Sequence, residues 1–144
     1  MHYWDTSALV KLYVSESDSA LFAGHQTVTG QATTFAITRW EMFRVLNRKE
    51  ADGVISGGAA SAIFARFLAD VSVGNINLMP IDRALEARFQ QVLLRLLRMS
   101  PQLMARTLDG IHIATADLHG AEEMVATDAN MRRCAASIGL KFYP

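Results

Sequence analysis

The chain has 144 residues, a length typical of one compact domain with one hydrophobic core. Hydrophobic residues make up 51% of it and charged residues 19%, a balance that excludes an intrinsically disordered protein. The formal net charge is zero, so the whole molecule carries no basic excess for nucleic acid, and any phosphate-binding surface must be local.

The opening residues and the single cysteine indicate the compartment. The segment MHYWDTSALV has neither the basic start nor the long apolar run of a secretion signal. Cys134 has no second cysteine in the chain with which to pair. The mostly apolar stretch at residues 89–97 is far shorter than the roughly 20 apolar residues that span a membrane. We therefore expect a cytoplasmic protein that does not cross a membrane.

Strand and helix patterns alternate along the first half of the chain. In order, they predict a strand at 2–6, a helix from Ser7 that breaks near 15–19, a strand at 31–34, a helix at 35–49 and a helix at 61–73. Thr34 is the expected N-cap of the helix at 35–49, and Gly53 lies beyond its end.

The same alternation continues in the second half. It predicts a strand at 76–80, a long helix at 82–99, a helix at 107–118, a strand at 124–127, a helix at 129–138 and a strand at 140–143. Ser100 and Pro101 end the long helix, and Gly139 is the expected C-cap of the last one. This order predicts an α/β protein, a three-layer α/β/α sandwich with a central, mostly parallel sheet.

Four acidic side chains are predicted to meet at one edge of that sheet. Asp5 closes the first strand and Asp128 follows the fourth. Asp109 lies in the first turn of the helix before the fourth strand, and Glu41 lies one turn into the helix after the second. Ligands of open parallel sheets bind beyond the carboxyl ends of the strands, so a site is expected there.

Each acid also has a purely structural interpretation. Asp5 and Asp128 could cap the helices that follow them, and Asp109 could complement the positive end of a helix dipole. Glu41 could form a surface ion pair with Arg44, three residues along the helix. Together, however, four carboxylates aimed at one edge would repel one another unless a cation lay among them.

Oxygen ligands without a cysteine or histidine cluster favour Mg²⁺ or Mn²⁺ over zinc. The four histidines, His2, His25, His112 and His119, do not have the spacing of a zinc site. A magnesium ion activates water and neutralises phosphoryl oxygens, so hydrolysis of a phosphodiester is the leading chemistry.

Several other side chains could assist at such a site. His112 lies one turn from Asp109 on the same helix face, where it could orient water or contact phosphate, although a structural role is favoured. Arg44, Arg48 and Arg132 could hold RNA phosphates at the rim or could be solvated helix charges. Trp40 and the apolar stripe in the helix at 82–99 are expected in the core, with leftover apolar surface available to a partner.

Four segments of the sequence resemble the PIN-domain family and, within it, the VapC-like toxins of type II toxin–antitoxin pairs. The segments are YWDTSALVKLYV, TRWEMFRVLNR, TLDGIHIATA and VATDANMRRCAASIGLKFYP. They occur in the family's order and cover the chain from end to end. The resemblance implies a single PIN domain over residues 1–144.

The resemblance further implies a PIN fold and an endoribonuclease that hydrolyses RNA with Mg²⁺ or Mn²⁺. It also implies a homodimer and a cognate antitoxin protein as partner. The residues that match the family's four acidic positions, as metal ligands and catalytic residues, are Asp5, Glu41, Asp109 and Asp128. Thr6 or Ser7 matches the hydroxyl position after the first acid, and Thr127 the one before the last.

Three other functions fit part of the pattern. A phosphatase of the haloacid-dehalogenase type also places an Asp after its first strand, but it needs a second Asp where this chain has Ser7, and it has no use for Glu41. A non-catalytic α/β binding module would use the acids only as caps. A flap-type DNA nuclease needs additional carboxylates and a helical arch, for which 144 residues leave little room.

Overall fold

The computed structural model describes residues 1–144 and contains one five-stranded sheet in the order β3-β2-β1-β4-β5. Every neighbouring pair of strands is parallel. The strands are β1 (His2–Trp4), β2 (Ala32–Phe35), β3 (Ile76–Met79), β4 (Glu123–Val125) and β5 (Lys141–Tyr143).

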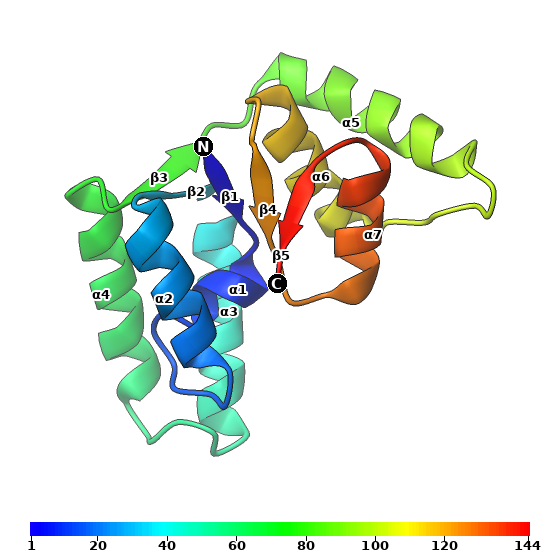
Figure 1. Cartoon of the computed structure of the whole chain (residues 1–144). Helices are drawn as coiled ribbons and strands as arrows, with labels where there is room; N and C mark the ends of the chain where they lie inside the picture. Colours follow the sequence, from blue (N-terminus) through cyan, green and yellow to red (C-terminus); the bar gives the residue numbers. More distant parts are fainter.

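Seven helices cover the two faces of this sheet (Figure 1). They are α1 (Thr6–Val10), α2 (Ser19–Thr29), α3 (Thr38–Ala51), α4 (Ala59–Ser72), α5 (Arg83–Leu97), α6 (Thr107–Leu118) and α7 (Ala129–Ser137). The helices α1 to α4 lie on one face and α5 to α7 on the other (Figure 1). The predicted three-layer α/β/α architecture is confirmed. None of the helices combines the length and the apolar character needed to cross a membrane.

The central strand β1 is buried on both faces. Successive side chains of a strand point to opposite sides of the sheet. Tyr3 accordingly packs in the core formed with α5, α6 and α7, and Trp4 packs in the core formed with α1 to α4. Neither side chain is exposed to solvent. Two hydrophobic cores, one on each face, thus fix the position of β1.

The connection pattern creates the crevice where a site can form. From β1 the chain adds β2 on one side, whereas β4 pairs on the other side. Ligands of open parallel sheets bind at such a switch point. Trp4 lies opposite Val125 in the register, and the backbone N–H of Asp5 donates to the carbonyl of Val125 at 2.9 Å. The residues that follow β1 and β4 therefore emerge side by side.

The predicted N-cap at Thr34 is wrong. The second strand runs on to Phe35, and α3 begins at Thr38, with Ile37 at its N-cap position and no side-chain cap. The β-branched pair Thr33 and Thr34 followed by Phe35 favours the strand. The Thr34 hydroxyl instead hydrogen-bonds to the Thr38 hydroxyl at 2.8 Å.

The first helix is shorter than predicted, because α1 ends at Val10 and α2 begins at Ser19. Lys11 holds the intervening turn by ion pairs to Glu16 and Asp18. The helix predicted at 107–118 is found with the same bounds, and the boundaries of the later elements and of the strands differ by at most two residues, apart from the start of α3.

Trp40 was expected in the core, but 67% of this residue is exposed on α3. The helix turns Met42 and Leu46 inward instead, and both are fully buried. Of the apolar stripe at 82–99, Val92 and Leu96 are in the core as predicted, and the partly buried Phe89 and Leu93 pack against it.

The helices α5 and α6 approach closely at Gly110. A Cβ atom built at Gly110 would lie 3.0 Å from Cε2 of Phe89 and 3.2 Å from Cδ2 of Leu93. We expect Gly110→Val to lower the free energy of unfolding by about 1–3 kcal/mol, because the added methyl groups overpack this contact. Gly24→Val is the matched control, since a Cβ at Gly24 in α2 meets nothing within 4 Å.

The measurement is urea unfolding of both variants beside the wild type. The control should stay within about 0.5 kcal/mol of wild type, as the helix propensities of Gly and Val predict. Equal stability of the two valine variants would contradict the close packing of α5 on α6.

Candidate active site

A cavity of about 730 Å³ opens at the carboxyl ends of β1 and β4. All four predicted acids line it, and each comes from a different helix or helix start: Asp5, Glu41, Asp109 and Asp128. Residues more than 120 positions apart in the sequence thus share one pocket because parallel neighbouring strands end at the same edge.

Asp5 caps α1 and also faces the cavity. Its Oδ2 accepts hydrogen bonds from the backbone N–H of Ser7, at 3.0 Å, and from the Ser7 hydroxyl. The Thr127 hydroxyl donates to the oxygen of Ser7 at 2.8 Å. The other oxygen, Oδ1, lies 3.7 Å from Nε2 of His112. The structural and functional interpretations of Asp5 are therefore compatible, because each uses a different oxygen.

Asp128, like Asp5, both caps a helix, α7, and lines the cavity. Its Oδ1 accepts a hydrogen bond from the backbone N–H of Met131 at 2.7 Å, which makes it the N-cap of that helix. Because the cap occupies one oxygen, the side chain can also present its second oxygen to the cavity that it lines.

Asp109 lies among like charges. Burial raises the pKa of its carboxyl above the ordinary value, and the neighbouring carboxylates of Asp5 and Asp128 raise it further. Arg106 and His112 offset part of this effect. The raised pKa means that ionised Asp109 destabilises the protein when no cation is bound.

Glu41 is held by a buried histidine. Its Oε2 accepts hydrogen bonds from Nε2 of His112, at 2.8 Å, and from the hydroxyl of Thr6. Burial alone would raise the pKa of Glu41, but the hydrogen bond and charge of His112 and the bond from Thr6 outweigh it, and the pKa is lowered. The structural alternative, a surface ion pair with Arg44, is not what holds this carboxylate, although the charge of Arg44 also lowers its pKa.

His112 connects the site to the centre of the fold. Only 1% of it is exposed, and its Nδ1 lies 2.7 Å from the hydroxyl oxygen of Tyr3. Burial alone would lower the pKa of His112, but the hydrogen bond to Glu41 and the charge of Asp5 raise it. Burial also raises the pKa of Tyr3. When His112 is protonated, its Nε2 donates to Glu41 and its Nδ1 to the neutral phenol of Tyr3.

Two arginines at the rim could hold phosphate. Arg44, which the sequence suggested, lines the cavity, and so does Arg106, which the sequence analysis missed. Arg106 is the N-cap residue of α6, three positions before Asp109, and this spacing was the available signal.

The other two suggested arginines lie outside the cavity. Arg48 pairs with Asp52 on the surface at 2.7 Å, and Arg132 donates to the carbonyl of Pro144. Lys11 and Lys49 do line the cavity, but both are paired with Glu16.

The donor set in the cavity fits a hydrated Mg²⁺ or Mn²⁺ ion. All four acids offer carboxylate oxygens, which these hard cations prefer. No three of them bring ligand atoms within 4.8 Å of one another, so a single ion at the observed spacing would reach some of these carboxylates only through water. Mg²⁺ in proteins keeps several waters and takes few direct carboxylate ligands, which suits this spacing.

Asp109→Asn tests whether Asp109 is a crowded charge or a structural dipole partner. In EDTA at pH 7 the variant should melt at the same temperature as wild type or higher, because it removes a carboxylate whose ionisation costs the folded state stability. This advantage should fade as the pH falls through the raised folded-state pKa of Asp109, and it should vanish below 3.8, the ordinary pKa of Asp, where the carboxyl is protonated in both the folded and the unfolded states.

Magnesium should raise the melting temperature of wild type but hardly that of Asp109→Asn, because ligand stabilisation requires an intact site. Asp117→Asn is the matched control on the same helix, since Asp117 lies 3.4 Å from Arg88 and does not line the cavity. The metal-site interpretation of Asp109 is wrong if Asp109→Asn is clearly less stable than wild type in EDTA and magnesium raises the melting temperature of all three proteins equally. Asp109 would then be only a structural partner of the helix dipole.

Comparison with known proteins identifies the family. The family model described as PIN domain matches residues 3–137. No curated protein sequence matches the chain significantly.

Several solved structures share the fold over nearly their whole length. FitAcB from Neisseria gonorrhoeae has a TM-score of 0.70 at 14% identity and covers 100% of this chain and 97% of its own. VapBC2 from Rickettsia felis, in a structure with a DNA fragment from the VapBC2 promoter, has a TM-score of 0.66 at 12% identity. It covers 99% of this chain and 98% of its own. VapC20 from Mycobacterium tuberculosis, a Sarcin-Ricin loop cleaving toxin, has a TM-score of 0.65 at 17% identity, with 97% and 96% covered. The chain belongs to the PIN-domain family.

Proposed function

We propose that the protein is a metal-dependent endoribonuclease that hydrolyses RNA phosphodiester bonds and acts as the toxin of a toxin–antitoxin pair. The observation that carries this proposal is one open cavity lined by four acids and by the rim arginines Arg44 and Arg106. Membership of the PIN-domain family supports nuclease chemistry. The similarity in fold to VapC20, described as a toxin that cleaves an RNA loop, supports the toxin assignment.

The four acids would hold Mg²⁺ or Mn²⁺, which supplies an activated water and neutralises charge on the phosphoryl oxygens. Asp5 and Asp128 present the oxygens that their capping roles leave free. Glu41 is kept ionised by His112, which we assign as a positioning residue because it is buried and acts through Glu41. Arg44 and Arg106 would bind RNA phosphates, since arginine pairs well with phosphate oxygens.

The two side chains beside the acids that best suit a nucleophilic mechanism, Ser7 and His112, are both engaged in hydrogen bonds. The Ser7 hydroxyl donates to Asp5 and accepts from Thr127, and His112 is already bonded through both ring nitrogens. This arrangement favours attack by water over a covalent intermediate. It also disfavours the phosphatase alternative, because the position two residues after Asp5 carries this bonded hydroxyl in place of a carboxylate.

We predict that cleavage of RNA by the purified protein stops in EDTA and returns with Mg²⁺ or Mn²⁺ but poorly with Zn²⁺, whose preferred ligands differ. Asp5→Asn and Asp109→Asn should each lose roughly a hundredfold activity or more, a greater loss than outer partners of a metal cause. Asp117→Asn should cleave like wild type. Undiminished cleavage in excess EDTA would sink the metal-dependent mechanism.

The antitoxin partner has a structural rationale at α3. Trp40 and Phe43 are 67% and 54% exposed there, beside the cavity-lining Glu41 and Arg44. An exposed aromatic patch next to an acid pocket suits a partner segment with apolar side chains and an arginine or lysine that enters the pocket.

We also expect a homodimer, which sedimentation velocity of the purified chain tests directly.

Expression of the chain alone should arrest growth, and co-expression of its antitoxin should relieve the arrest. Asp109→Asn should be harmless to the host, whereas Asp117→Asn should be as toxic as wild type. If wild-type protein is soluble and folded in the cell, yet growth and translation continue unchanged, the toxin assignment fails.

A further inference from the structure

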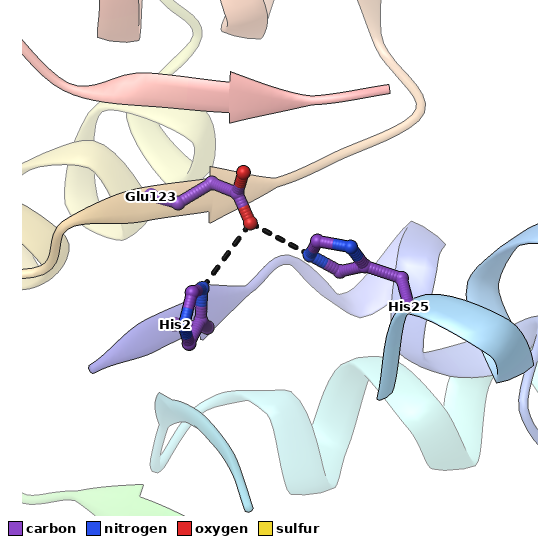
Figure 2. A group of neighbouring side chains, drawn as sticks. All are labelled: His2, His25 and Glu123. Atoms are coloured by element: carbon purple, nitrogen blue, oxygen red, sulfur yellow. Dashed lines mark hydrogen bonds and ion pairs between the residues drawn. The ribbon is translucent and has the colours of Figure 1, made fainter. Parts of the chain in front are cut away.

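A second cluster of metal-binding side chains lies at the edge of the sheet opposite the acid cavity. His2 is the first residue of β1 and Glu123 the first of β4, and the two are register partners. His25 reaches them from α2, as Figure 2 shows. The cluster is the only group in the structure in which three such side chains bring ligand atoms within 4.8 Å of one another.

The three side chains converge on one oxygen atom. Nδ1 of His2 lies 3.2 Å and Nε2 of His25 lies 2.6 Å from Oε1 of Glu123 (Figure 2). Their exposed fractions are 27% for His2, 13% for His25 and 18% for Glu123. The cluster is thus sheltered enough to be held in place and open enough for an ion from solvent to reach it.

Aromatic contacts fix the orientation of the rings. The ring of His25 stacks on that of Tyr143 in β5, with centroids 3.6 Å apart and planes 11° from parallel. The rings of His2 and His25 meet at 89° with centroids 6.0 Å apart. Oriented ligands lose less conformational freedom when they bind an ion, so this packing favours metal binding.

The geometry points to a Zn²⁺ site formed by His2, His25 and Glu123, and we propose that it binds this ion with water as the fourth ligand. Two imidazoles and one carboxylate are a ligand set that zinc uses. In a tetrahedral site with bonds of about 2.0–2.2 Å, ligand atoms lie roughly 3.3 Å apart. The observed spacings need only small side-chain movements to reach this value.

The bound ion would fasten α2 to the sheet. Only Phe22 of α2 is buried, and Asp18 at its N-cap makes no capping hydrogen bond, so the helix has few other attachments. A zinc ion would join it to β1 and β4 at a point separated from Asp5 by three residues of strand, about 10 Å. The site is therefore independent of the acid cavity, and its role is to stabilise the fold.

The test uses the full chain without a polyhistidine tag, at pH 7.5, where imidazole binds metal in its neutral form. Co²⁺, a coloured substitute for zinc, should bind with a stoichiometry of one in the presence of excess Mg²⁺, and Zn²⁺ should displace it. Zinc should also raise the melting temperature and slow hydrogen exchange in α2. His25→Gln and Glu123→Gln should abolish the cobalt absorption and the zinc-induced shift, whereas His119→Gln and Asp109→Asn should retain both.

Two results would overturn the proposal: no cobalt or zinc binding by wild type, or binding that survives His25→Gln and is lost in Asp109→Asn. If a variant fails to fold, histidine ring NMR of the wild type decides the question. Zinc should then shift the signals of His2 and His25 while leaving those of His112 and His119 in place. Shifts of His112 alone would assign the ion to the acid cavity.

Discussion

Repulsion among carboxylates at the ends of β1 and β4 is the interaction on which the rest of the site depends. Asp5 and Asp128 are brought together because their strands are parallel neighbours, and both raise the pKa of Asp109 between them. Helix capping fixes one oxygen of each strand-terminal Asp, so neither side chain can turn fully away from its neighbours. The fold thereby keeps negative charge concentrated in a cavity where a bound divalent cation would remove the energetic cost of the repulsion.

The ion pair between His112 and Glu41 offsets part of the negative charge of the cavity from its buried side. Because the pKa of His112 is raised, protonated His112 stabilises the folded state. This contribution is fully present below pH 6.5, the ordinary pKa of histidine, and it fades as the pH rises through the folded-state pKa. Because the pKa of Glu41 is lowered, ionised Glu41 also stabilises the folded state. This contribution is fully present above pH 4.5, the ordinary pKa of glutamate, and it fades as the pH falls through the folded-state pKa. The pair thus stabilises the protein most between these two values. Through Tyr3, it also ties the site to the core of β1.

The sequence predicted the architecture and the convergence of the four acids on one cavity, for identifiable reasons. Alternating hydrophobic patterns depend on local geometry, and an acid directly after a strand must emerge at the sheet's edge. Thr34 was misassigned because a threonine suits both an N-cap and a strand, and the pairing with β3 decided for the strand. Trp40 was misplaced because helix periodicity alone does not tell which of two apolar faces turns inward.

Other features depend on tertiary contacts that have no sequence signal. The partners of His112 come from β1 and α3, which a helical wheel of α6 cannot show. The histidines have no zinc-site spacing along the chain, yet strand register and the position of α2 bring His2, His25 and Glu123 together. Such a cluster becomes visible only when the sheet order is known.

Manganese titration followed by electron paramagnetic resonance tests most directly whether the acids form a metal site, because it counts free Mn²⁺ without depending on activity. If the acids form a metal site, wild type and Asp117→Asn will bind Mn²⁺ equally, and Asp109→Asn and Asp128→Asn will bind it about tenfold or more weakly. Equal binding by all four proteins, or no binding by wild type, would contradict the assignment of these carboxylates to a cation.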